Sequence, residues 1–294
     1  MTHAFRRSLT SLSLATSLFA IATVAQAEDG APMSVAVADG VAAAATPAPT
    51  AAPTAAEAER FVANAEAQLA ADSIRGQRAA WIYETYINHD TEELAATAGA
   101  QSTALAVRLA LDAARFNGVA GLSPEVARKL SILRTAIVSP APTTEGAADQ
   151  LAAAITHMSS IYGAGHGTLR GQPINGSDIE AEMGTNRNPA ELAEMWTSWH
   201  NSVGTPMRDD FTRMVTISNR GARELGYADT GVLWRSNYDM TPEQFAATTE
   251  RLWQEVKPLY DQLHCYVRTK LNEKYGDAVQ PATGPIRADL LGNM

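Results

Sequence analysis

The sequence predicts an all-α fold, and three observations support this prediction. Four positions carry a helix-capping residue followed directly by Pro, which is the pattern of a helix start. Apolar residues recur at helical spacing over long runs after residue 57. No run alternates apolar and polar residues with period two between hairpin turns, so nothing indicates a sheet.

The four predicted helix starts share one pattern, a capping residue followed by proline. They are Ser123–Pro124, Asn188–Pro189, Thr205–Pro206 and Thr241–Pro242. Proline is tolerated at the first helical position because its missing N–H would have no intrahelical partner there. Glu191 and Gln244, three residues after Asn188 and Thr241, are expected to close capping boxes.

The first 27 residues have the anatomy of a secretory signal peptide. Arg6 and Arg7 precede the apolar stretch 9–24, and an A-x-A signal ends at Ala27. This stretch is too short and too rich in Ser and Thr for the ~20 apolar residues that a bilayer span needs. We expect cleavage near Ala27, export to the periplasm or beyond, and no stable membrane anchor.

Residues 28–56 are rich in Ala, Pro and Thr, which cannot bury enough apolar surface to offset the entropy of ordering. We expect a disordered tether over this stretch. Residues 57–294 then form the helical domain. Within it, Gly226 and Gly276 are expected to end helices, Pro258 to bend one, and the glycine-rich segment 163–167 to form a flexible loop.

Composition excludes several classes of function. The 294 residues carry 32 acidic and 23 basic side chains, a net charge of −9, and no basic cluster. Nucleic acid binding is therefore not expected, because neutralising phosphates requires a basic surface. The single cysteine, Cys265, excludes an intrachain disulfide and any metal site made of several cysteines.

No catalytic or metal-binding motif occurs in the sequence. None of the six histidines is followed by Glu, and no two are four residues apart, so there is no H-E-x-x-H zinc motif. A nucleophile elbow and a P-loop are also absent. The acidic residues at 84, 90, 92 and 93 are interpreted as solvated helix faces. We assign no catalytic residue and no metal ligand.

Several stretches resemble the angiotensin-converting enzyme family and its bacterial members. They are MGTNRNPAELAEMWTSW (183–199), ELGYAD (224–229), WRSNY (234–238), WQEVKPLYDQLHCYVR (253–268), KYG (274–276) and GPIRADLLGNM (284–294). The resemblance runs from about residue 57 to the end and is strongest after residue 183. It implies a helical ellipsoid divided by a deep cleft, with the first helices forming a lid.

The resemblance also implies a zinc peptidyl-dipeptidase, which releases dipeptides from the C-termini of oligopeptides. In the family the zinc is held by an H-E-x-x-H helix and a more distant Glu, all downstream of the matched stretches. The chain is thus expected to correspond to the N-terminal half of the domain, with the lid helices and part of one cleft wall. The apolar face of its long helix at 245–271 should then be left exposed.

For binding residues the resemblance implies little. Tyr238 matches a tyrosine that helps to bind an activating chloride in the animal enzymes. A second chloride position would involve Trp199 and His200, but the family has Arg where this chain has His200. A mostly neutral imidazole holds an anion less well than a guanidinium, which makes the second site doubtful.

Three interpretations of the chain remain open. It can be a truncated form of an exported zinc peptidyl-dipeptidase, the interpretation that we favour. It can be a catalytically inactive helical module that binds peptides or a partner protein. It can also be one half of a split enzyme whose C-terminal half is encoded separately.

Overall fold

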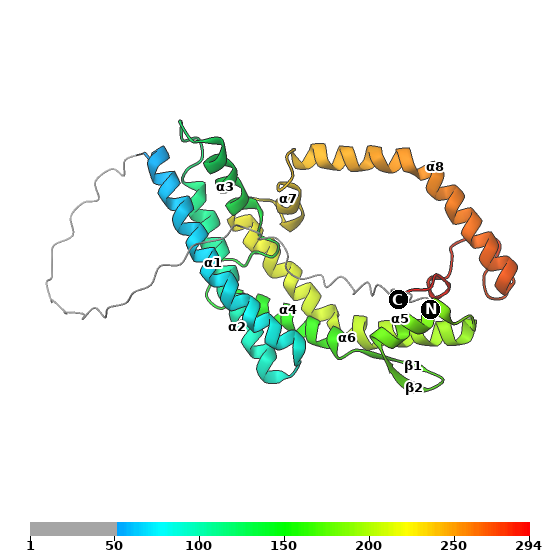
Figure 1. Cartoon of the computed structure of the whole chain (residues 1–294). Helices are drawn as coiled ribbons and strands as arrows, with labels where there is room; N and C mark the ends of the chain where they lie inside the picture. Colours follow the sequence, from blue (N-terminus) through cyan, green and yellow to red (C-terminus); the bar gives the residue numbers. More distant parts are fainter. Residues whose placement is uncertain (1–51) are drawn as a thin grey trace, which may run out of the picture. The chain divides into compact units, whose positions relative to one another are not determined.

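A computed structural model describes residues 52–294, and this part of the chain is helical almost throughout (Figure 1). The elements are α1 (Ala55–Thr85), α2 (His89–Ala114), α3 (Pro124–Thr135), α4 (Ala147–Gly163), β1 (His166–Leu169), β2 (Gln172–Asn175), α5 (Gly176–Thr185), α6 (Pro189–Glu224), α7 (Thr230–Arg235), α8 (Pro242–Tyr275) and the 3-10 turn η1 (Ala288–Leu290). The all-α prediction is confirmed. None of the helices in this part is both long enough and apolar enough to cross a membrane.

The first helix begins slightly earlier than the sequence predicts. The predicted signal peptide at 1–27 and most of the predicted tether lie outside the described residues. Thr54 and Glu57 form a capping box, in which each side chain accepts a hydrogen bond from the other residue's backbone N–H. The last two residues of the predicted tether therefore belong to α1.

Three of the four predicted helix starts are confirmed. Ser123, Asn188 and Thr241 cap α3, α6 and α8, and each is followed by Pro at the first helical position. The predicted capping box of Thr241 and Gln244 is present. At the other end of α8, Gly276 has a φ of 76°, a conformation that glycine adopts readily.

The predicted helix start at Thr205–Pro206 is wrong. Pro206 lies inside α6, which continues through it as one helix of 36 residues. An internal proline removes one helical hydrogen bond and crowds the preceding turn. Val203 and Ile217, on either side of the proline, are both buried. Packing of this continuous face outweighs the local cost, as tertiary contacts commonly do for helices.

The predicted flexible loop at 163–167 is only partly correct, because His166 begins a β-hairpin. Leu169 of β1 pairs with Gln172 of β2, which leaves Arg170 and Gly171 as a two-residue turn. Both turn residues have positive φ, 53° and 73°. Such turns match the twist of a hairpin. Each strand has only four residues, too few to show a clear period of two.

Buried side chains join the helices in three main places. One core lies between α1, α2 and α3 around Phe116, and a second lies between α4 and α6 around Leu151 and Ile217. The third lies between α5 and α6 around Met195 and Trp199. The β-hairpin and η1 both contact α6. The long helix α6 therefore joins α4, α5, α7, the hairpin and η1, whereas α1, α2 and α3 pack on one another and reach α6 through α4.

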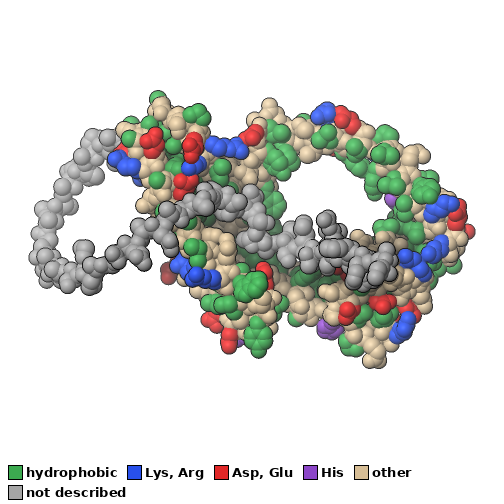
Figure 2. Space-filling view, viewed as in Figure 1, with side chains coloured by type: hydrophobic (Ala, Val, Ile, Leu, Met, Phe, Trp, Pro, Cys, Tyr) green, Lys and Arg blue, Asp and Glu red, His purple; other side chains and the backbone are tan. Residues whose placement is uncertain are grey.

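Helix α8 differs from the others because none of its 34 residues is buried. It contacts α7, and near its C-terminal end Leu271 and Tyr275 pack against the α5–α6 core. Between these contacts it carries exposed large apolar side chains, visible in Figure 2. These are Leu252, Trp253, Val256, Leu259, Tyr260, Leu263 and Tyr266.

These seven side chains form one surface, which we call the α8 apolar face. At 3.6 residues per turn they fall within an arc of about 140° around the helix axis. A surface helix of a globular protein normally turns such a stripe toward a core. In the described residues nothing covers it, which agrees with the exposure predicted from the sequence.

Candidate functional site

Tyr238, the predicted anion ligand, lies between α7 and α8. Its ring packs on Phe245 with 4.2 Å between the ring centroids, and about half of the residue is exposed. Among residues 52–294 its hydroxyl has no hydrogen-bond partner, so the group is available to a ligand. The neighbouring Asp239 carboxylate forms an ion pair with Arg128 of α3. The role of Tyr238 as an anion ligand stays a prediction.

Trp199 and His200, the doubtful second anion position, have different environments. Trp199 is buried against the hairpin region, where a Cβ added to Gly176 would lie 2.7 Å from its ring. The His200 ring stacks on Trp196 at 3.9 Å, and its Nδ1 donates to the carbonyl oxygen of Trp196 at 2.7 Å. Only Nε2 of His200 is left for a ligand. This arrangement gives Trp199 a packing role, and anion binding here stays untested.

A buried carboxylate that the sequence analysis missed joins α4 to α6. Asp210 of α6 accepts a hydrogen bond from Nδ1 of His157 at 2.6 Å and one from Arg213 at 2.9 Å. Asp210 and Arg213 are three residues apart, a spacing that places two side chains next to each other on a helix and can be recognised in the sequence. His157, however, is 53 residues away in the sequence, so no local pattern could have revealed the cluster. Both carboxylate oxygens are engaged, which makes it a link between helices.

A second polar network joins α1, α2 and α4. The Ser160 hydroxyl donates to Glu92 at 2.6 Å and lies 2.8 Å from the hydroxyl of Tyr83. Burial raises the pKa of Tyr83 above its ordinary value. A serine nucleophile needs an adjacent general base such as histidine, and none of the described histidines is hydrogen-bonded to Ser160. The network therefore has a structural role.

Two carboxylates of α6 hold the hairpin. Arg170 donates to Glu191 through Nε at 2.9 Å and Nη2 at 3.0 Å, and this bond lowers the pKa of Glu191 to about 2. Glu194 accepts the turn N–H groups of Arg170 and Gly171 at 3.0 and 2.8 Å, and the bond from Gly171 lowers its pKa. The capping box predicted for Glu191 and Asn188 is absent, because Glu191 binds the hairpin instead.

Acid is expected to weaken this attachment. Because the pKa of Glu191 is lower in the folded chain, its contribution to stability is present above the unfolded value near 4.5. The contribution is lost as the pH falls toward about 2. The difference in free energy of unfolding between wild type and Glu191→Gln should therefore be constant above pH 5 and shrink below pH 4.5. Urea unfolding at several pH values measures it, with the exposed Glu59→Gln as control. A difference unchanged down to pH 2.5 would contradict the assignment.

The described residues do not fit the zinc that the resemblance implies. A protein zinc site needs at least three His, Cys, Asp or Glu ligands around one point. Within residues 52–294 no three such side chains lie close enough to hold a metal ion. Asp210 has a histidine partner, His157, but its other carboxylate oxygen is bound by the guanidinium of Arg213. Cys265 is exposed, and it is the single cysteine of the sequence.

The described part also has a polar groove of about 380 Å³ near the C-terminal end of α8. It is lined by Met183, Gly184, Asn186, Arg187, Leu192, Leu271, Lys274, Tyr275, Leu290, Leu291 and Gly292. Lys274 makes no ion pair among the described residues. Arg187 donates to the carbonyl oxygens of Gly184 and Asn186. The groove thus offers two cations beside apolar side chains.

The fold and these sites define a helical protein with a large uncovered apolar face and, in its described part, no metal centre. A sequence model of the angiotensin-converting enzyme family (peptidase family M2) matches residues 52–294. The chain therefore belongs to this family.

Individual relatives agree with the family assignment. Angiotensin-converting enzyme of Haematobia irritans exigua is 28% identical over 246 residues, which are 81% of this chain and 39% of that protein. The Bos taurus enzyme is 32% identical over 244 residues, 81% of this chain and 18% of the relative. The Oryctolagus cuniculus enzyme is 34% identical over 175 residues, which are 58% of this chain and 13% of that protein. The chain thus spans well under half the length of these relatives.

Proposed function

We propose that this chain forms the lid helices and part of one cleft wall of an exported peptidyl-dipeptidase domain. Residues outside these 294 would supply the zinc site and the general base. The family match over 52–294 supports the peptidase assignment. No H-E-x-x-H motif occurs in the sequence, and this supports an external origin of the metal site. The substrates are oligopeptides that lose a C-terminal dipeptide.

The observation that carries this proposal is the α8 apolar face. Burying a large apolar side chain contributes roughly 1.5–3 kcal/mol relative to leaving it in water. A stripe of seven such side chains, none buried, is therefore a surface made to be covered. We propose that the zinc-bearing part of the domain covers it, either as more of the same polypeptide or as a separately encoded half.

Complementation tests the proposal. The purified chain by itself should hold no stoichiometric zinc and should not release a dipeptide from a blocked tripeptide. Addition of the zinc-bearing remainder of a related peptidase domain should restore release. The double variant Leu259→Glu/Leu263→Glu should abolish restoration, because it places charges on the covered face. Gln254→Glu/Gln262→Glu adds the same charge away from that face and serves as the control.

Two outcomes would contradict the proposal. The first is one tightly bound zinc per chain, or chelator-sensitive peptidase activity of the chain alone. The second is complementation that the α8 double variant leaves unchanged, since the α8 face would then not be the surface that meets the catalytic part.

A second candidate function, a catalytically inactive peptide-binding module, is favoured by the groove with Arg187 and Lys274. Two cations beside apolar side chains suit a peptide with a free C-terminal carboxylate. This candidate predicts that the chain alone binds such peptides and that Lys274→Glu or C-terminal amidation weakens binding. The chloride role of Tyr238 remains part of the main proposal, with Trp199 and His200 as its less supported second site.

A further inference from the structure

Two asparagines of the chain are followed directly by glycine, at Asn117–Gly118 and Asn175–Gly176. An Asn–Gly step can lose the side-chain amide, because the backbone nitrogen after the asparagine can attack the amide carbon. A glycine at that position has no Cβ to hinder the approach. Both asparagines are exposed. Their surroundings differ, however, and the difference predicts which of the two reacts.

The peptide bond between Asn117 and Gly118 is not held by hydrogen bonds. Among the described residues the N–H of Gly118 and the carbonyl oxygen of Asn117 both lack a partner, whereas the N–H groups of Asn117 and Val119 do donate. Gly118 has a φ of 77°, and a Cβ built on it would meet no atom within 4 Å. The peptide plane can therefore rotate and bring the nitrogen of Gly118 to the side chain of Asn117 without breaking a hydrogen bond.

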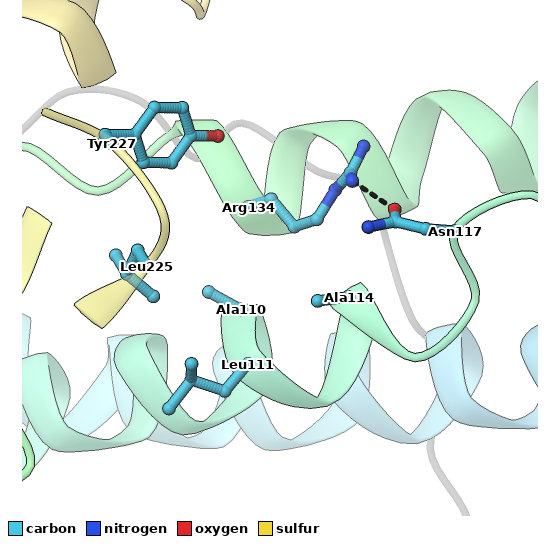
Figure 3. A pocket seen from close by; sticks show the side chains of 7 residues that line it. All are labelled: Ala110, Leu111, Ala114, Asn117, Arg134, Leu225 and Tyr227. Carbon is cyan, nitrogen blue, oxygen red and sulfur yellow. Dashed lines mark hydrogen bonds between the residues drawn. The ribbon is translucent and has the colours of Figure 1, made fainter. Parts of the chain in front are cut away.

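Arg134 of α3 binds the amide that would react. Its Nη1 donates to Oδ1 of Asn117, as the dashed line in Figure 3 shows. Arg134 forms no ion pair with a carboxylate among residues 52–294, and its Nε has no partner there either. Negative charge builds up on Oδ1 when a nucleophile attacks the amide carbon, and a guanidinium at that oxygen stabilises this charge, as an oxyanion hole does. Arg134 is thus placed to accelerate the attack.

Asn175 has the opposite environment. It caps α5, where its Oδ1 accepts from the N–H of Asp178 at 2.9 Å and its Nδ2 donates to the carboxylate of Asp178 at 2.7 Å. Both polar atoms of the amide are therefore fixed, and a carboxylate rather than a cation lies beside them. A negative charge next to the amide opposes the build-up of a second one. We expect Asn175 to be protected.

We propose that Asn117 is a site of spontaneous deamidation that Arg134 promotes. The backbone nitrogen of Gly118 forms a bond to Cγ of Asn117, and the side-chain nitrogen leaves as ammonia with the proton from the N–H of Gly118. A water molecule then opens the resulting succinimide ring at either carbonyl. The products are aspartate and isoaspartate, and each places a new carboxylate where the neutral amide stood.

The two products should affect the fold differently. Aspartate keeps the backbone and can form an ion pair with Arg134, so it should leave the helices in place. Isoaspartate adds one methylene to the main chain next to Phe116, which is buried in the core between α1, α2 and α3. Because such a core is closely packed, this change should lower the thermal unfolding midpoint. The inference does not depend on the proposed peptidase function.

Mass spectrometry of the full chain tests the proposal. The folded chain is incubated at mildly alkaline pH in water enriched in heavy oxygen, so that only deamidation during this incubation incorporates the label. Trypsin then releases residues 116–128 with Asn117 and residues 171–187 with Asn175. In the folded chain Asn117 should convert at least about tenfold faster than Asn175, and in guanidinium chloride the two rates should become similar. A protease that cuts before aspartate but not before isoaspartate separates the two products.

Variants assign the acceleration to Arg134. Arg134→Gln should slow the conversion of Asn117 at least about tenfold, because it removes the charged donor from the reacting oxygen. Arg134→Lys keeps the charge but loses the planar guanidinium, and should slow the conversion less. Gly118→Ala should also slow it, because a methyl group hinders the attacking nitrogen. Arg128→Gln removes a charge from the same helix away from Asn117 and should react as wild type does.

Three results would overturn the proposal. One is a folded wild-type chain in which Asn117 converts no faster than Asn175. Another is an unchanged or faster conversion in a folded Arg134→Gln variant, as loosening of the turn by itself would give. The third is a difference between the two asparagines that persists in guanidinium chloride, because it would then come from local sequence. Where Arg134→Gln fails to fold, a rate in Arg134→Lys equal to that in Arg128→Gln overturns the role of Arg134.

Discussion

The Trp199→Ala variant is expected to lose about 3–5 kcal/mol of its free energy of unfolding. Trp199 is 7% exposed and packs among Ile179, Met195 and Val203 in the core between α5 and α6. Truncation removes its apolar contacts and leaves a cavity that the surrounding helices fill only in part. A domain is typically stable by only 5–15 kcal/mol, so the loss should be visible as a large fall in the urea midpoint.

A matched control separates burial from the loss of any tryptophan. Trp81 on α1 is 70% exposed, and Trp81→Ala should change the free energy of unfolding by less than about 0.5 kcal/mol. A loss at Trp199 no larger than at Trp81 would contradict the packing role.

Local signals in the sequence predicted most of the helical fold. The caps at Ser123, Asn188 and Thr241 could be predicted because a capping side chain satisfies N–H groups two or three residues away. The same local rule failed at Pro206, which follows Thr205 but lies within α6. Whether a helix continues through a proline depends on the side chains packed along both halves, and these come from distant parts of the chain.

The hairpin and the polar clusters could not be predicted for a related reason. Glu194 binds the turn at Arg170 and Gly171 across more than twenty residues, and no spacing rule connects such positions. The pair His157 and Asp210 is likewise formed only when α4 packs on α6. Hydrogen bonds across helices depend on how the helices pack, and a single sequence does not reveal that.

The candidate sites also differ in whether they depend on local sequence or on how distant segments pack. Tyr238 could be singled out from the sequence because it lies in a recognisable motif, but the surroundings of its hydroxyl could not be predicted. In contrast, most of the α8 apolar face could be predicted from helical periodicity, although Leu259 and Tyr266 were not among the predicted residues and the exposure of the face was expected only from the resemblance.

Without the covering part that we propose, the chain is expected to self-associate through the α8 apolar face. Leu259 is 73% exposed and Leu263 57% exposed, and apolar area of this kind drives association when nothing else covers it. Size exclusion should show oligomers, a dye for apolar surfaces should bind, and thermal unfolding should be broad while circular dichroism reports high helix content.

Charge placed on the face should reverse this behaviour. Leu259→Glu/Leu263→Glu should give a monomer that binds less dye and keeps its helix content, because no residue of α8 is buried. Gln254→Glu/Gln262→Glu adds the same charge outside the arc of the face and should leave association unchanged. A wild-type chain that is monomeric, binds no dye and unfolds sharply would contradict the need for a covering part. That result would favour the stand-alone peptide-binding module, because an apolar face stable in water needs no catalytic partner.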